Sequence, residues 1–222
     1  MILYFTFEKN NKTQLTELPL RFALEDVYKV GSETVPVGVV KTRVLRPGMK
    51  VTFVPSSTRD VEVKMVDFHL ISGNMQMNEA MPGDNASFSV KGAHVQDIKR
   101  GMIAGDADDP PSEAESFTAL VTVLNHPGEI GAGYTAVVDV HTARVKCTFA
   151  RMLQKYSSPG SAIEENAEKI KQGDVALVEL VPTKPLCVET FKDYPPLGHI
   201  TVTNNRTNVA VGIITSVKKK ET

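Results

Sequence analysis

Short runs in which hydrophobic and polar residues alternate follow one another along most of the chain. Clear examples are Lys50–Val54, Val61–Val66, Phe117–Leu124 and Val137–Val140, all rich in Val, Thr or Phe. Alternation with a period of two, carried by β-branched and aromatic residues, is typical of strands that bury one face. Many short strands at close spacing predict an all-β protein built from barrels or sandwiches.

Turn residues separate these runs. Pro-Gly pairs stand at Pro47-Gly48, Pro82-Gly83 and Pro127-Gly128, where proline presets φ and glycine permits a positive φ. One stretch, Ile163–Lys171, begins with acidic residues and ends with basic ones. That charge order favours a short helix, which we expect inside a surface insertion.

The segment at 105–115 is acidic, contains Pro110-Pro111 and shows no periodicity, as expected of an exposed connector. Two consecutive prolines should keep it extended and fairly stiff. The chain of 222 residues is long enough for two small domains that each bury a core. The sequence therefore predicts two all-β domains.

Composition and the two cysteines indicate the cellular compartment of the protein. A hydrophobic content of 41% and a charged content of 23% are ordinary for a soluble protein, and no apolar run is long enough to span a membrane. The apolar start Met1–Phe7 lacks the basic region and cleavage site of a signal peptide. Cys147 and Cys187 lie in apolar or alternating runs, which favours buried free thiols in a reducing compartment. We expect a cytoplasmic protein with no membrane contact.

Charge and motifs exclude several functions. The net charge is −3 for residues 1–115 and +2 for residues 116–222, so neither half carries the strong basic excess of an obvious nucleic-acid binder. No phosphate-binding loop and no D-x-x-G sequence occur, and Asn11-Lys12-Thr13-Gln14 lacks the acid of the guanine-reading N-K-x-D motif. The five histidines show no metal-ligand spacing. We expect a binding protein with neither a metal site nor enzymatic activity.

A series of short motifs then gives a resemblance. The first half contains Asp26-Val27-Tyr28-Lys29, Arg46-Pro47-Gly48-Met49 and Pro82-Gly83-Asp84-Asn85. The second half contains Asn125-His126-Pro127-Gly128 and Asp193-Tyr194-Pro195-Pro196-Leu197-Gly198. In this order and spacing the motifs resemble eukaryotic translation elongation factor 1-alpha, over roughly residues 18–217 and without its GTPase domain.

The resemblance implies the domain plan and the partners. Residues 18–106 would form the translation-factor barrel that is the family's second domain, and 114–217 its C-terminal barrel. Residues 107–113 would be the linker, 218–222 a basic tail, and 1–17 stay unassigned. The family delivers aminoacyl-tRNA to the ribosome in a GTP-dependent reaction. GTP and magnesium belong to the missing domain, so the resemblance implies no cofactor in this chain.

Glu79 stands where the family's acidic residue contacts the terminal adenosine at the 3′ end of tRNA. A carboxylate suits that role, because it accepts a hydrogen bond from a ribose hydroxyl or an exocyclic amine. The alternative is a solvated carboxylate before a turn.

A second group of candidates would contact the tRNA backbone. His141, Thr142, Arg144 and Lys146 fall on one predicted strand, with Thr142, Arg144 and Lys146 on the same face. Two cations on a polar face suit a row of phosphates, although an ordinary solvent-facing strand has the same pattern. For His141, a half-buried structural role is the alternative. Arg206, in a turn before the last strand, is the remaining candidate, and Lys218–Lys220 is expected to be a solvated tail.

Two stretches depart from the family pattern. Gly38–Arg43 has valine, lysine and arginine where the family has arginine, glutamate and glycine, and His199 and Thr203 replace two arginines. Fewer cations should weaken phosphate binding. Three hypotheses therefore stay open. The chain engages aminoacyl-tRNA through both barrels, or it is a diverged module that docks on exchange-factor subunits, actin or a GTPase domain in trans, or it is a decayed copy that folds and does little.

Overall fold

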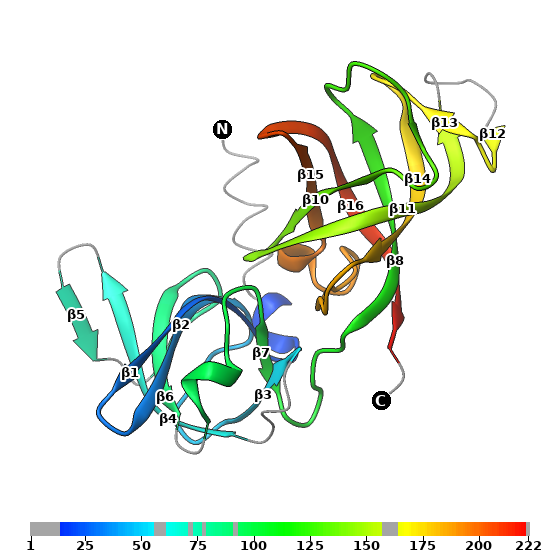
Figure 1. Ribbon diagram of the computed structural model, residues 1–222. Coiled ribbons are helices and arrows are strands. Elements are labelled where there is room, and N and C mark those ends of the chain that lie inside the picture. Colours follow the sequence, from blue (N-terminus) through cyan, green and yellow to red (C-terminus); the bar gives the residue numbers. More distant parts are fainter. Residues whose placement is uncertain are drawn as a thin grey trace, which may run out of the picture. The chain divides into compact units, whose positions relative to one another are not determined.

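The computed structural model describes residues 14–55, 61–70, 73–76, 79–90, 93–156 and 164–220. For 64–70 and 73–76 it describes the backbone alone. The chain divides into two compact units, Met1–Pro111 and Ser112–Thr222 (Figure 1). The division falls within the segment 107–113 that the sequence suggests as a linker.

The first unit is a barrel that closes on itself. Its main sheet follows the order β3-β7-β1-β2-β6-β4-β5, and an additional β3–β4 pairing closes six of these strands into a ring. A short 3-10 turn, η1 (Val95–Asp97), precedes the last strand. The strands are β1 Arg21–Val30, β2 Glu33–Thr42, β3 Lys50–Val54, β4 Val61–Leu70, β5 Gly73–Gln76, β6 Asn85–Val90 and β7 Ile103–Asp106.

The second unit closes in the same way. Its sheet follows the order β10-β15-β16-β8-β14-β11-β12, and a β10–β11 pairing completes the ring. β9 and β13 form a separate two-stranded ribbon, and η2 (Pro195–Leu197) precedes β15. The strands are β8 Ala114–Val123, β9 Ile130–Gly131, β10 Thr135–Val140, β11 Ala143–Tyr156, β12 Glu164–Glu165, β13 Lys169–Ile170, β14 Val175–Pro182, β15 His199–Asn204 and β16 Thr207–Lys219. Two closed barrels confirm the predicted all-β fold.

Each barrel has its own hydrophobic core, built from the inward side of the alternating strands. In β2, buried and partly exposed residues alternate over all ten positions, as period two requires. Phe22 packs edge-on against Phe88 at 5.0 Å between ring centroids, and Phe53 stacks on Phe88 at 6.3 Å. Phe117 and Phe149 are fully buried in the second core. These cores make the barrels rigid supports for side chains on their outer faces.

Two of the three predicted Pro-Gly turns use glycine as expected. Gly48 has φ +84° and Gly83 has φ +96°, a region that costs other residues about 1 kcal/mol or more. Gly128 lies in a bend and does not have a positive φ. The third pair therefore forms a bend that needs no left-handed residue.

The predicted helix at Ile163–Lys171 is wrong. Ile163 itself lies outside the described residues, but Glu164 and Glu165 pair with Lys155 and Gln154 of β11. Lys169 and Ile170 pair with β9. Backbone pairing with strands that already exist outweighs the weak helical preference of a nine-residue segment, which is too short to be stable alone.

The expectation of a solvated basic tail is also wrong for its first residues. Lys218 and Lys219 belong to β16 and pair with Ser116 and Ala114 of β8. The Lys218 ammonium forms an ion pair with Glu115 at 3.0 Å. The end of the described chain therefore completes the barrel wall.

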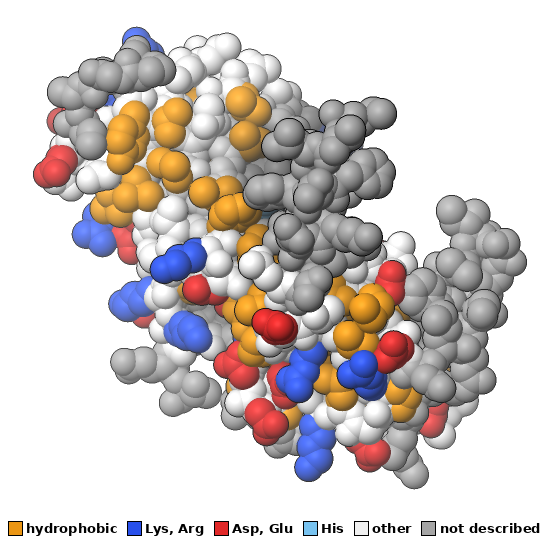
Figure 2. Space-filling view, turned by 180° about the vertical axis from the view of Figure 1, so that it is seen from behind, with side chains coloured by type: hydrophobic (Ala, Val, Ile, Leu, Met, Phe, Trp, Pro, Cys, Tyr) orange, Lys and Arg blue, Asp and Glu red, His pale blue; other side chains and the backbone are white. Residues whose placement is uncertain are grey.

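The outer face of the second barrel carries a row of three apolar residues. Leu120 of β8 lies opposite Leu177 of β14 on one side and Ile213 of β16 on the other, and all three are partly exposed. Directly opposed residues share a face of the sheet, so the three side chains are neighbours. Figure 2 shows hydrophobic side chains reaching the surface of this unit.

Candidate nucleic-acid interface

Glu79 lies at the surface of the first barrel and is held by an arginine. An isolated bridge pairs Leu45 with Ala80 in antiparallel fashion, so Arg46 and Glu79 stand opposite each other. Arg46 donates to the Glu79 carboxylate through Nε at 2.9 Å, and its second nitrogen lies 2.8 Å away. Both side chains are about half exposed. The proposed 3′-end contact is therefore an acid already paired with a cation.

The sequence suggested that His141 and Thr142 lie on a strand, and this prediction is wrong. They are the two central residues of the turn between β10 and β11, and His141 has φ +41°. The Thr142 amide donates to His141 Nδ1 at 2.8 Å. Nε2 therefore carries the hydrogen, which it donates to the Cys187 carbonyl at 3.0 Å. Both ring nitrogens thus have a structural task.

Arg144 and Lys146 follow that turn on β11 and are both exposed, as the predicted alternation requires. Arg144 stands opposite Asp139 of β10, and its Nε lies 3.2 Å from the Asp139 carboxylate. The buried Thr203 hydroxyl of β15 donates to the other Asp139 oxygen at 3.0 Å. An acid thus lies within the cationic row.

Arg206 lies at the tip of the β15–β16 hairpin. Asn205 and Arg206 have φ values of +47° and +67°, the signature of a two-residue type I′ turn. Behind the tip, Asn204 donates to the Tyr134 hydroxyl at 2.9 Å. The arginine is exposed on a hairpin whose backbone is firmly held.

The structure brings some of the candidates together and separates others. Arg144 and Lys146 share the outer face of β11, and His141 and Thr142 lie at its beginning. Arg206 extends beyond the opposite end of β10, because Val140 pairs with Ile200 and Val137 pairs with Thr203. A strand rises about 3.3 Å per residue, so roughly 20 Å separate Arg206 from His141. Glu79 belongs to the other unit.

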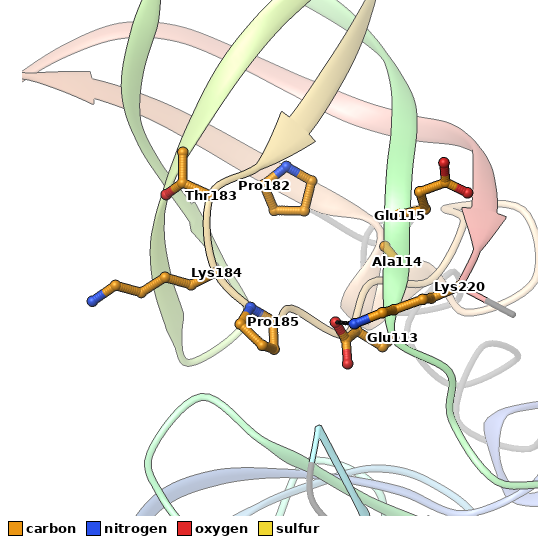
Figure 3. A pocket seen from close by; sticks show the side chains of 8 residues that line it. All are labelled: Glu113, Ala114, Glu115, Pro182, Thr183, Lys184, Pro185 and Lys220. Carbon is orange, nitrogen blue, oxygen red and sulfur yellow. Dashed lines mark hydrogen bonds and ion pairs between the residues drawn. The ribbon is translucent and has the colours of Figure 1, made fainter. Parts of the chain in front are cut away.

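A shallow pocket of about 300 Å³ opens elsewhere on the second barrel, where the linker enters it. Figure 3 shows the Lys220 amine directed at the Glu113 carboxylate, 2.9 Å away, while the Lys184 amine points away from the hollow. Pro182, Pro185 and Ala114 supply an apolar lining. The charge of Lys220 is met internally, so this pocket is a weak candidate for an anion site.

The described part of the chain offers no cluster of three His, Cys, Asp or Glu residues that could hold a metal ion. No described helix is long and apolar enough to cross a membrane. Cys147, inside the second core, is a buried free thiol, and burial raises its pKa from 9.0 to about 12. Such a thiol is a poor nucleophile.

Comparison with known proteins shows which proteins this chain is similar to. Residues 116–215 match the family described as "GTP-eEF1A C-terminal domain-like". Elongation factor 1-alpha of Coccidioides immitis is 50% identical over 212 residues, covering 94% of this chain and 45% of that protein. The Neurospora crassa protein and the Xenopus laevis oocyte form are each 52% identical over 92% of this chain, which covers 44% of each. The chain is a homologue of elongation factor 1-alpha. It spans a little less than half the length of these relatives.

A solved structure supports the fold of this elongation factor 1-alpha homologue. Sup35 complexed with GDP superimposes with a TM-score of 0.82 at 22% identity, over 93% of this chain and 49% of Sup35. Sup35 complexed with GMPPNP gives 0.81. At this identity the match shows a shared fold.

The departures from the elongation factor 1-alpha pattern have visible structural effects. Arg43 stands where the pattern has glycine, has a left-handed φ of +59° and forms an ion pair with Asp106. Lys41 is half-buried, and desolvation lowers its pKa while Glu25 opposes the shift. Thr203, in place of an arginine, supports Asp139. Arg43 and Thr203 have thus acquired local partners, and Thr203 stands at one of the two positions where the pattern has an arginine.

Sequence reasoning missed two partners in this homologue, Arg46 and Asp139. The signal for Asp139 is the turn itself. A two-residue turn at His141-Thr142 makes Val140 face Ala143 and therefore Asp139 face Arg144. A turn predicted at His141-Thr142 would therefore have predicted the ion pair.

Proposed function

We propose that this chain is the RNA- and partner-binding part of a factor that takes part in GTP-dependent delivery of aminoacyl-tRNA to the ribosome. Identity of 50–52% to proteins named elongation factor 1-alpha, over 92–94% of this chain, supports the proposal. The two barrels bind without catalysing a reaction. GTP and magnesium would be held by a GTPase domain outside these 222 residues, and the factor would act in the cytoplasm.

The observation that carries this proposal is the outer face of β11. Arg144 and Lys146 project from the same side of one strand, about 7 Å apart, on a closed barrel. Cations at that spacing on a rigid support can follow successive phosphates of an RNA strand, and such contacts position a nucleic acid without reading its sequence. Arg206 would supply a further phosphate contact, and Thr142 and His141 would shape the end of the face.

Glu79 would contact the 3′ end of the tRNA from the first barrel. Arg46 orients the carboxylate by donating from one side. The remaining capacity of a carboxylate to accept hydrogen bonds suits a ribose hydroxyl. Selection of the aminoacylated form would depend on this barrel, whereas the second barrel would contribute affinity for the backbone.

A titration against aminoacylated and uncharged tRNA at two salt concentrations tests the proposal. We expect tighter binding of the aminoacylated form, and binding that weakens with salt because counterions are released. Lys146→Gln should weaken binding of both forms equally, while Glu79→Gln should reduce the preference between them. Lys192→Gln, which removes another exposed lysine of the second unit, is the matched control. Equal and weak binding of both forms, lost at the higher salt, would contradict the proposal.

A second function, docking on another protein, is favoured by the apolar row of Leu120, Leu177 and Ile213. Apolar side chains gathered on an outer face commonly mark a protein contact. Exchange-factor subunits, actin or a GTPase domain supplied in trans are the candidate partners. If this second function is correct, calorimetric titration with one of these partners should show a stable complex that Leu120→Ser weakens. The tRNA titration should then show no preference between the aminoacylated and uncharged forms.

A further inference from the structure

Asp139 occupies an unexpected place in the cationic row of the second barrel. It lies on β10 directly opposite Arg144 of β11. Lys146 lies on the same outer face of β11 as Arg144 and is opposite Val137 of β10. The carboxylate engages Arg144 Nε at 3.2 Å through one oxygen and the Thr203 hydroxyl at 3.0 Å through the other. The local charge of Arg144, Lys146 and Asp139 is therefore +1.

Thr203 makes this arrangement more than a chance surface pair. Its side chain is buried, and only 6% of the residue is exposed. Because the residue that carries the hydroxyl is buried on β15, its hydrogen bond helps to orient the carboxylate toward Arg144. Asp139 cannot swing away without losing a hydrogen bond from a buried donor, which is costly.

The pair is at the same time weak enough to be broken by a competing anion. Arg144 is 64% exposed and Asp139 is 36% exposed, so water screens their attraction. Guanidinium has five N–H donors and prefers to bind phosphate through two of them at once. A phosphate that approaches Arg144 competes with Asp139 for this cation and is repelled by the same carboxylate.

We propose that Asp139 is a built-in competitor that lowers the affinity of the outer β10–β11 face for a phosphodiester backbone. The inference rests on the proposed RNA-binding function and adds a regulatory residue to it. A factor that must release its RNA gains from weak backbone contacts, because dissociation rates then stay high. Asp139 is a positioning residue in this scheme and acts through Arg144.

The test uses the full chain and a fluorescent RNA duplex of about 12 base pairs, titrated at several salt concentrations. Asp139→Asn keeps an acceptor for Thr203 but removes the charge. We expect about 2- to 5-fold tighter binding, the size of one exposed ion pair, and a salt slope steeper by close to one unit. In an Arg144→Gln background the same substitution should give no gain, which is the readout of coupling between the two residues.

Glu129→Gln is the matched control. Glu129 pairs with Lys169 at 2.9 Å on the β9–β13 ribbon, and both are more than half exposed. This change also removes one acid and releases one lysine, but away from the β10–β11 face, and should leave duplex binding unchanged. An equal gain from Glu129→Gln, a gain that survives Arg144→Gln, or no gain from Asp139→Asn would each overturn the proposal.

The same proteins, titrated with aminoacylated and uncharged tRNA, separate this inference from the proposed function. Preference for the aminoacylated form without an effect of Asp139→Asn would sink the inference and leave the function standing. An Arg144-dependent gain without that preference would support the competitor and reject the delivery function. Absence of duplex binding in every variant would reject the inference.

Discussion

Arg206 is unusual because a charged side chain occupies a backbone position that suits glycine. The type I′ turn requires a positive φ at both central residues, and asparagine followed by glycine is its preferred pair. Here Asn205 is followed by Arg206, whose φ is +67°. A residue with a Cβ in this region costs about 1 kcal/mol. Keeping arginine in spite of that cost is consistent with a role for its charge at the hairpin tip.

Arg206→Gly should therefore stabilise the second barrel while weakening RNA binding. We expect a gain of about 1 kcal/mol in the free energy of unfolding, because the strain at this φ disappears. Urea denaturation measures the gain. Arg206→Ala is the control, since it removes the charge but keeps the Cβ. Equal stability of the two variants would show that the backbone position carries no strain.

Cys147 predicts a dependence of stability on pH. Burial raises its pKa to about 12, whereas the thiol of the unfolded chain ionises near 9.0. Between these values the unfolded state loses the proton and the folded state keeps it, so stability must fall as pH rises. Unfolding at pH 8 and pH 11 should show a larger loss for the natural chain than for Cys147→Val. The same loss in both would mean that this thiol does not contribute.

For single residues, the sequence predicted which side chains are exposed better than it predicted their ion-pair partners. The exposure of Arg144 and Lys146 followed from alternation alone. The partners that neutralise Glu79 and Arg144 could not be predicted in this way, because a cross-strand neighbour depends on the register of the two strands. A change of one residue in the length of the turn shifts that register. His141 shows the same limit, since its role changes when the turn moves.

The strands are held together at two places where glycine allows one backbone to approach another. In the first barrel, a Cβ at Gly38 would lie 2.0 Å from the Ala23 carbonyl oxygen. In the second, a Cβ at Gly212 would lie 2.4 Å from the Leu120 carbonyl oxygen. Both distances are far below any normal contact, and the obstructing atom is backbone. The close pairing of β1 with β2 therefore depends on Gly38, and that of β8 with β16 depends on Gly212.

Gly212→Ala should destabilise the second barrel, and Gly38→Ala the first, by about 1–3 kcal/mol each, as overpacking typically does. Hydrogen exchange followed by mass spectrometry would locate each loss in its own unit. Gly128→Ala is the control, because a Cβ there would meet no atom closer than 3.9 Å. Tolerance of alanine at Gly38 and Gly212 would contradict the described strand contacts.

The barrel strands were predictable because their pattern is long and regular, whereas the elements at 164–170 were not. Two-residue strands such as β12 and β13 have no periodicity to detect. Their pairing with β11 and β9 is decided by neighbours distant in sequence. Local charge order then favoured a helix that tertiary pairing overrides.

Across the whole molecule, each ring contains a pairing between segments distant in sequence. β1 pairs with β7 in the first unit, and β8 pairs with β16 in the second (Figure 1). Contacts of this kind are slow to form, because a long loop must be ordered before any pairing is gained. The two units have separate cores, so closure of one does not require closure of the other.

A chain ending at Asn205 should keep the first barrel and lose the second. Without β16, the strands β8 and β15 each lose a partner, and the second core is opened to water. We expect protected amides to remain in 18–106 and to disappear from 114–205 in hydrogen exchange. A chain ending at Lys220 should match the full chain. Protection in both barrels of the shorter chain would contradict separate closure.

The pairing of Lys219 with Ala114 also sets an order of events during synthesis of the protein. The first barrel has all its strands once Asp106 has emerged from the ribosome, whereas the second must wait until Lys219 has emerged. A ribosome that stops within the thirteen codons of β16 would release a chain with one folded barrel and one set of strands whose unpaired edges are prone to aggregate. Quality control of such products would then act on the second half of the chain alone.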